Sequence, residues 1–317
     1  MPAIRSLRRA IAFVLLVVEL TNGAARGAPP RVVAVLYPET SAPYQRVFEE
    51  ILSGIDQGLA GETVRARALP ESPDALEVRR WLDRQSAAAV IALGRVATEA
   101  FEATGSPTPY LIGALDVSPQ TRPRATGVGL AVDPALLFAT MRLLKPATRR
   151  IWVVFNPRHD RWLIERAEPA ARALDLVLLP LEAVDQSAAA RQFLQVLRAA
   201  DAGADALWLV ADIGVVEPET ILPTVIEQSW QRKLAVFSGS LQHVRRGVLF
   251  ALYPDNRQLG RRLAELALRV MADPRARPGI EPLRAIRRAL SLRVASHLDL
   301  KVSQEMERQF DWVLPPW

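Results

Sequence analysis

Polar and charged side chains gather where the short apolar runs of this sequence end. Such runs are the expected strands of an α/β chain, and ligands of parallel sheets collect beyond the carboxyl ends of the strands, where helix N-termini present unpaired N–H groups. The set consists of Tyr37, Glu39, Thr40, Ser41, Gly94, Arg95, Thr98, Asp116, Asn156, Arg158, His159, Asp212, Ser238, Gly239 and Ser240. These acceptors, hydroxyls and amides suit a small polar or zwitterionic ligand, although loops at strand ends are polar in most proteins.

No catalytic motif accompanies these residues. The three histidines are far apart and lack metal-ligand spacing. The sequence contains neither a phosphate-binding loop, nor a dinucleotide fingerprint, nor the serine elbow of hydrolases, and it has no cysteine. We therefore expect no catalysis, no metal and no cofactor. A hydrolase would instead need a hydroxyl and an imidazole within hydrogen-bond reach, and the candidates are His159 or His243 with Ser238, Ser240 or Thr98.

The composition indicates a globular chain with about two lobes. The 317 residues are 50% hydrophobic and 23% charged, and a typical domain has roughly 150 residues. The formal charge of +6 falls to +3 when residues 1–27, which contain four Arg and one Glu, are set aside. Because acidic and basic residues are interspersed, we expect no nucleic-acid partner.

The first 27 residues are typical of a secretory signal peptide. Arg8 and Arg9 precede the apolar run 10–18, and small residues follow it. This run is too short for a membrane span, which needs about 20 apolar residues. We expect cleavage after residue 25 or 27 and a periplasmic protein without stable membrane insertion; the alternative is an uncleaved anchor helix.

From residue 31 onwards, short β-branched runs alternate with longer amphipathic stretches, a pattern typical of α/β proteins with parallel sheets. Strands are expected at 32–37, 63–68, 88–93 and 110–113, and in a second series at 151–155, 176–180, 206–210, 234–237 and 248–253. Helices are expected at 44–59, 160–174, 187–200, 219–232 and 255–272. Trp152 and Trp208 fall inside expected strands, which favours core positions.

The two series look like copies of one unit. Residues 31–38 align with residues 150–157 at an offset of 119, and both segments end in Pro before a helix. A late apolar run, 290–300, is left over after the second series. A chain that builds one lobe, then the other, and then adds late elements must cross between lobes more than once. We therefore expect a hinge of several crossings and no flexible linker.

The segments 151–157, 204–212 and 246–255 resemble the bacterial ABC transporter substrate-binding family that includes tryptophan- and tyrosine-binding lipoproteins. The likeness extends over residues 31 to about 300. It implies the type I periplasmic-binding fold, in which two Rossmann-like lobes with parallel sheets are joined by a multi-crossover hinge. The expected boundaries are 28–126 with 252–283 for lobe 1, and 127–251 with 284–317 for lobe 2.

The resemblance also implies where a ligand lies. In such proteins the two lobes close on the ligand, and the closed form is presented to a membrane permease. Carried over by position, the helix start at 94–98 would meet a ligand carboxylate, and acidic or amide side chains would hydrogen-bond to the rest. The expected ligand-binding residues are Glu39, Gly94, Arg95, Thr98, Asp116, Asn156, Asp212, Ser238 and Tyr253.

The sequence departs from the family pattern at several of these places. No cysteine is available for lipid attachment, Val follows Asp116 where the family usually has Pro, and Arg95 replaces a small residue. The late strand expected at 291–295 lacks the family's Asn. Two interpretations therefore stay open: delivery of an amino-acid-like or small carboxylate ligand to an ABC permease, or a periplasmic sensor of the same fold that acts on a membrane protein without a transporter.

Overall fold

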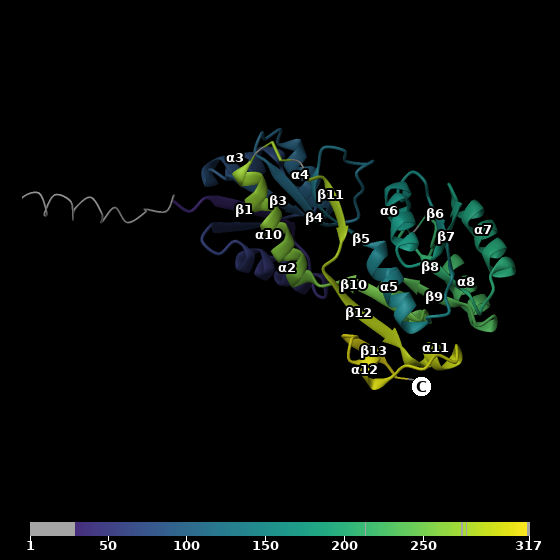
Figure 1. Cartoon of the computed structure of the whole chain (residues 1–317). Helices are drawn as coiled ribbons and strands as arrows, with labels where there is room; N and C mark the ends of the chain where they lie inside the picture. The colour runs from purple at the N-terminus through teal and green to yellow at the C-terminus, as the bar shows by residue number, and fades with distance from the viewer. Residues whose placement is uncertain (1–28, 213, 274, 277, 316–317) are drawn as a thin grey trace, which may run out of the picture. The chain divides into compact units, whose positions relative to one another are not determined.

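Two separate sheets, most of whose strands run parallel, form the framework of the protein (Figure 1). The computed structural model describes residues 29–315 apart from 213, 274 and 277. The expected signal peptide lies outside these residues. No helix among them is both long enough and apolar enough to cross a membrane.

The first sheet has the strand order β11-β5-β4-β3-β1-β2, and all of its neighbouring pairs are parallel. Its strands are β1 (Val32–Pro38), β2 (Thr63–Leu69), β3 (Ala89–Leu93), β4 (Tyr110–Leu115), β5 (Thr126–Val132) and β11 (Ile280–Leu283). The helices in its part of the chain are α2 (Tyr44–Gly58), α3 (Ala75–Gln85), α4 (Gly94–Ala103) and α10 (Asn256–Ala272).

The second sheet has the order β13-β12-β10-β9-β8-β6-β7, and only its β10–β12 pair is antiparallel. Its strands are β6 (Arg150–Phe155), β7 (Val177–Glu182), β8 (Asp205–Leu209), β9 (Ala235–Ser238), β10 (Phe250–Pro254), β12 (Ile286–Ser291) and β13 (Trp312–Leu314). The accompanying helices are α5 (Pro134–Leu144), α6 (Arg161–Arg172), α7 (Gln186–Ala199), α8 (Ile221–Gln231), α9 (Leu241–Arg246), α11 (Leu292–His297) and α12 (Gln304–Glu307).

The first five strands of the two sheets follow the same spatial order. This order is β2-β1-β3-β4-β5 in one sheet and β7-β6-β8-β9-β10 in the other. Segments 31–38 and 150–157, which align in the sequence, contain β1 and β6, the second strand of each order. The expected α/β architecture of two Rossmann-like lobes with largely parallel sheets is confirmed.

The chain crosses between the sheets three times: from β5 to α5, from β10 to α10, and from β11 to β12. Hydrogen bonds join the crossings to one another. Asp133 N donates to Leu283 O at 2.9 Å, and Asp255 N donates to Ala285 O at 2.9 Å. Arg284 forms an ion pair with Asp133. The hinge is therefore a set of adjacent, hydrogen-bonded segments, as a chain with several crossings requires.

Sheet membership differs from the expected lobe boundaries at both early crossings. Strand β5 belongs to the first sheet, so the chain leaves that sheet after Val132 and not after residue 126. Strand β10 belongs to the second sheet, which moves the next crossing from residue 251 to beyond Pro254. Glycine weakens strand patterns in a sequence, but β5 needs Gly127: a Cβ there would lie 2.0 Å from the Ile112 carbonyl oxygen of β4.

The prediction of a late strand at 291–295 is wrong. Strand β12 ends at Ser291, and residues 292–297 form α11. The reason is local: Ser291 is the N-cap of this helix, and its Oγ accepts a hydrogen bond from Val294 N at 3.3 Å. Such a cap starts a helix by satisfying one of its free N–H groups.

The packing of the first lobe depends on a close approach of α2 and α10, which lie side by side in Figure 1. A Cβ on Gly54 of α2 would lie 2.0 Å from the Arg257 carbonyl oxygen, and a Cβ on Gly260 of α10 would lie 2.1 Å from that of Ile51. Because backbone contacts backbone here, even alanine at either glycine would push the helices apart.

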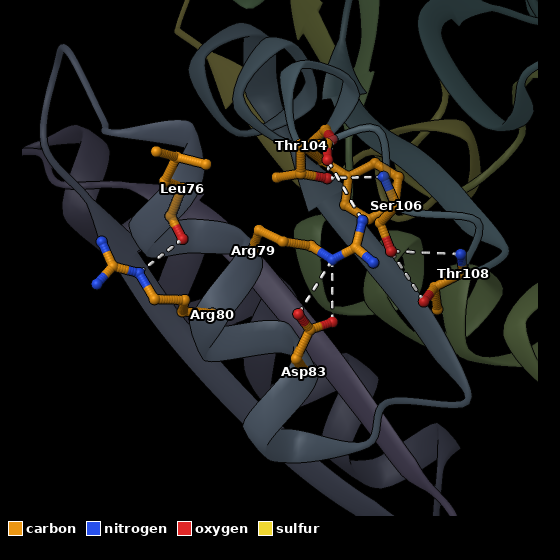
Figure 2. Close-up of polar contacts among 8 residues, drawn as sticks. Leu76, Arg79, Arg80, Asp83, Thr104, Ser106 and Thr108 are labelled. Atoms are coloured by element: carbon orange, nitrogen blue, oxygen red, sulfur yellow. Dashed lines mark hydrogen bonds and ion pairs between the residues drawn. The ribbon is translucent and has the colours of Figure 1, made fainter.

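Helices α3 and α4 are tied together on the other side of the same lobe, as Figure 2 shows. Arg79 Nε donates to the two carboxylate oxygens of Asp83 at 3.0 and 3.1 Å, and Arg79 Nη1 reaches Thr104 O at 3.4 Å. These contacts fix the C-terminal end of α4, whose N-terminal end follows directly on β3.

The core of the second lobe is aromatic. Phe138 of α5 meets Trp208 edge-on, with ring centroids 5.5 Å apart, and also meets Phe237 edge-on at 6.4 Å. Trp208 is buried, as its place in a strand predicted. Trp152 is only half-buried, and its indole N–H donates to the fully buried carboxylate of Asp205 at 2.9 Å.

Candidate ligand-binding site

A cavity of about 750 Å³ is lined by residues of both lobes. Its volume falls in the range of small-molecule sites, roughly 300–1,000 Å³. The first lobe contributes side chains of α2, β4, β5 and α10, and the second contributes the segments that follow β8 and β9 together with β10 and β12. A cavity of about 690 Å³ at α8, α9 and α11 is lined by one lobe alone, so the first cavity is the better candidate for a ligand that links the lobes.

One wall of the cavity is apolar. It includes Tyr44, Val47, Phe48 and Ile51, which lie one turn apart or less on α2. Tyr44 is largely exposed and therefore accessible to a ligand. Phe48 packs against Tyr37 of β1, with centroids 6.2 Å apart. The spacing predicts a surface on which a hydrocarbon or aromatic group can lie.

The polar residues of the lining come mainly from the second lobe. Ser240, His243, Tyr253 and Arg287 all line the cavity. The His243 Nδ1 atom lies 3.0 Å from Ser238 Oγ, so the structure does bring together one of the hydroxyl–imidazole pairs that a hydrolase would need. Burial, together with the charge of Arg246, lowers the pKa of His243 to about 4. The ring is therefore neutral at pH 7.

Asp212 follows β8 directly after Ala211, which lines the cavity. Its Oδ1 accepts a hydrogen bond from Gly214 N at 2.7 Å. Its Oδ2 is buried and has no hydrogen-bond partner among the residues that the structure describes. A buried carboxylate oxygen without a donor costs free energy, so this atom is suited to receive a donor from a ligand.

Two further carboxylates lie within electrostatic range of Asp212. Burial raises the pKa of Asp160 to about 7, and the charges of Asp212 and Asp116 add to the effect, against a hydrogen bond from Asn156 N. Asp116 is exposed as a residue, yet desolvation of its carboxyl and the charge of Asp212 raise its pKa, and His159 opposes the shift. Three mutually repelling acids favour a bound cationic group.

In the described part of the chain, no group of three or more His, Asp or Glu side chains is arranged to hold a metal ion. The acids near Asp212 can offer electrostatic attraction and hydrogen bonds to a cationic donor.

The expected carboxylate site at 94–98 does contain the start of a helix, but its side chains are buried or paired within that helix. Helix α4 begins at Gly94, immediately after β3, and the φ of +76° at Gly94 favours glycine there. Thr98 is fully buried, and its hydroxyl donates to Gly94 O at 2.8 Å inside the helix. Arg95 is exposed and pairs with Glu99 on the same helix at 3.2 Å. None of these residues lines the cavity.

Asn156, Ser238 and Glu39 use their polar groups locally. Asn156 is nearly buried, and its Oδ1 accepts from Arg158 N at 3.0 Å. Ser238 is fully buried, and its Oγ accepts from Ser240 N at 2.9 Å. Glu39 is exposed after β1. As ligand contacts these residues stay predictions.

Of the nine expected site residues, Tyr253 lines the cavity, and Asp116, Asp212 and Ser238 each lie within two residues of a lining position. The ligand-binding residues expected from the sequence did not include Tyr44, Phe48, His243 or Arg287. Tyr44 and Phe48 carried a usable signal, because aromatic residues four apart in the first helix after β1 share one face beside the strand ends. The other two are placed by contacts distant in sequence.

Comparisons with known proteins show which solved structures share this fold. No protein-family model matches the sequence, and no curated protein matches it. Three solved structures each align over 90% of this chain. A substrate-binding protein with adhesive properties from Clostridium difficile, in a ligand-free open structure, has a TM-score of 0.62 at 13% identity and is covered over 99% of its length.

The other two are covered over their full length. One is an ABC domain from Streptococcus pneumoniae in complex with L-Trp, with a TM-score of 0.54 at 16% identity. The second is a conserved domain protein from Vibrio cholerae, with a TM-score of 0.52 at 14% identity. Identities this low establish the fold alone. The chain has the type I periplasmic-binding fold, a class of two-lobed proteins that includes substrate-binding proteins.

Proposed function

We propose that this protein is a periplasmic solute-binding protein that captures a small ligand between its lobes and delivers it, unaltered, to an ABC importer. The observation that carries the proposal is the buried Oδ2 of Asp212, which lacks a donor among the described residues and belongs to the residue after Ala211, a lining residue of the cavity formed by both lobes. The type I periplasmic-binding fold supports it, and so does the hydrogen-bonded set of three crossings, which suits a hinge.

A binding function needs contacts that are complete only when both lobes touch the ligand. Tyr44 and Phe48 come from the first lobe, whereas His243 and the Asp212 segment come from the second. A ligand that touches both sets has a higher affinity for the closed arrangement of the lobes, and this difference in affinity drives closure.

The lining favours an amino-acid-like or small carboxylate ligand. The aromatic wall would hold an apolar body, the acids near Asp212 would attract an ammonium group, and Arg287 and His243 would meet an acceptor. The protein with this fold that was crystallised with L-Trp supports an aromatic amino acid as one ligand to test.

Hydrolysis is the competing function, because His243 Nδ1 lies 3.0 Å from Ser238 Oγ. Three features argue against it. Ser238 has no exposed surface, its Oγ already accepts the Ser240 N–H, and no described carboxylate bonds to His243. A nucleophilic serine needs an accessible hydroxyl and an oriented base. We therefore expect wild type and Ser238→Ala to hydrolyse p-nitrophenyl acetate equally slowly, and a large loss in the variant would favour the enzyme.

The binding proposal is tested by a thermal-shift panel of amino acids, short carboxylates and aromatic acids on the purified protein. A ligand at 100 times its Kd stabilises the fold by about 2.7 kcal/mol. Asp212→Asn keeps an acceptor for Gly214 N but removes the charge, so it should weaken binding of a cationic group by roughly 10- to 100-fold. Asp175→Asn, at an exposed turn, is the matched control. Absence of any shift in wild type would refute the proposal.

Delivery to an importer and ligand sensing are separated by genome neighbourhood. Genes for a permease and an ATPase beside this one support import. A neighbouring gene for a membrane sensor in place of both would instead support the sensing module of the same fold.

A further inference from the structure

The polar side of the cavity contains a histidine ring that is bonded at one nitrogen and free at the other. His243 Nδ1 contacts Ser238 Oγ at 3.0 Å. No described residue bonds to Nε2, and this atom is not among the buried polar atoms left without a partner. Because the half-buried ring lines the cavity, Nε2 is the nitrogen that a ligand can reach.

The hydrogen bonds of Ser238 favour one position for the proton of the His243 ring. Its Oγ accepts the Ser240 N–H at 2.9 Å, which leaves the hydroxyl proton to be donated. Two acceptors are in range: Ser240 O at 3.4 Å and His243 Nδ1 at 3.0 Å. With the hydroxyl proton on the shorter contact, to Nδ1, the neutral ring carries its own proton on Nε2. The ring then presents an N–H donor to the cavity.

Fixed charges near the ring favour an anionic partner. Arg287 lines the same cavity with a half-exposed side chain, and its Nε lies 3.6 Å from the carboxylate of Asp255. Burial is the main cause of the low pKa of His243, and the positive charge of Arg246 contributes to it. Glu50, the acidic residue of the lining, already accepts a hydrogen bond from Asn256 at 2.9 Å. Arg246, whose charge acts on the ring, donates to the Pro218 carbonyl oxygen and forms no ion pair with a described carboxylate, so its positive charge is less neutralised than the charges of Arg287 and Glu50.

We infer that His243 is a specificity-determining residue that donates its Nε2–H to the carboxylate of an apolar acid, whose hydrocarbon or aromatic body lies against Tyr44 and Phe48. The inference rests on the proposed function and names the ligand class more narrowly. It moves the carboxylate from the start of α4 to the α9 side of the cavity. Ser238 acts as a positioning residue, because it contacts the ring and not the ligand.

The test compares acids with their matched amides. We would measure by calorimetry the Kd of 3-phenylpropanoate, L-phenylalanine and hexanoate against 3-phenylpropanamide, L-phenylalaninamide and hexanamide. Wild type should bind the acids more tightly by roughly 10- to 100-fold, the contribution expected of hydrogen bonds to a charged group. His243→Asn, which has no donor at the Nε2 position, should lose this preference. His243→Gln, whose amide nitrogen reaches that position, should retain most of it.

Ser238→Ala should reduce the acid preference, because it frees the ring without removing the donor. A purely structural role for His243 would instead lower the affinity for acids and amides alike. Equal binding of acids and amides by wild type, or an undiminished preference in His243→Asn, overturns the inference and leaves the solute-binding proposal standing. If no probe of the panel binds wild type at all, both are overturned.

Discussion

Strand β8 has one aspartate at its first residue and another three residues beyond its end, and the two carboxylates are in opposite situations. Asp205 is fully buried and accepts hydrogen bonds from Arg150 Nε at 2.6 Å, Trp152 Nε1 at 2.9 Å and Asp201 N at 3.0 Å. Asp212 accepts one bond at Oδ1, and its buried Oδ2 has no described partner.

The aspartate at the start of β8 therefore has a structural role, whereas the aspartate beyond its end is suited to bind a ligand. At the amino end, burial alone would raise the pKa of Asp205, but its hydrogen bonds from Arg150, Trp152 and Asp201 outweigh burial and lower it. At the carboxyl end, the charge of Asp212 instead raises the pKa of Asp116 and of Asp160. A fully satisfied carboxylate stabilises the fold, whereas an unsatisfied one is stabilised by a ligand.

The largest expected effect is on the free energy of unfolding of alanine variants at the two positions. Asp205→Ala should lower it by about 2–4 kcal/mol, because the Trp152 indole N–H and the Asp201 N–H lose their acceptor, and each unsatisfied group costs about 1–3 kcal/mol. Asp212→Ala loses one hydrogen bond and relieves repulsion between acids, so its stability should stay within about 1 kcal/mol of wild type. Urea unfolding of both variants measures the difference. Similar losses at the two positions would contradict the distinction.

An effect of intermediate size is expected from the pH dependence of stability. The pKa of Asp160 is raised to about 7, so the folded state holds a proton that the unfolded state releases above about pH 4. Wild-type stability should therefore fall as pH rises from about 4 to about 7. Asp160→Asn removes this loss and should be more stable than wild type at pH 8, by on the order of 1 kcal/mol for a partly accessible group.

The control for this prediction has the opposite sign. The pKa of Asp205 is lowered, so its stabilisation is present above about pH 4 and is lost as pH falls through the folded-state pKa. The stability difference between wild type and Asp205→Asn should shrink in acid, whereas the difference for Asp160→Asn should grow toward neutral pH. Urea midpoints measured from pH 3 to pH 8 test both, and a flat difference for Asp160→Asn would contradict the raised pKa.

The sequence predicted the elements that place these carboxylates better than it predicted their partners. The apolar run 206–210 located β8, and the offset of 119 related β6 to β1 of the first lobe, because strand periodicity is a local property. The partners of Asp205 are distant in the chain: Arg150 is 55 residues away and reaches it through the register of β6 and β8. The periodicity of a single strand does not predict which residues of two strands are paired.

The residues at the cavity were also predicted only in part, because local sequence patterns do not show contacts between distant residues. Asp116 and Asp212 were predicted from their places after strands, and both lie within two residues of the lining. The sequence indicates His243 only as a possible partner of a hydroxyl. It does not indicate a ligand contact, because the direction of the ring depends on the contact with Ser238. Strand β5 was missed because glycine, which its close approach to β4 requires, weakens the strand pattern in the sequence.

The smallest expected effect is that of Trp152→Phe on the free energy of unfolding. This variant tests how much the indole N–H contributes to stabilising the Asp205 carboxylate. Trp152→Phe keeps an aromatic ring in β6 but removes the 2.9 Å hydrogen bond to Asp205 Oδ2, which still accepts from Arg150 Nη2 at 2.9 Å. We expect a loss of about 0.5 kcal/mol in the free energy of unfolding, at the low end for one hydrogen bond, because Asp205 keeps its other donors. In an Asp205→Asn background the same substitution should cost less, because the charged acceptor is gone. An equal cost in both backgrounds would mean that Trp152 stabilises the lobe by packing alone.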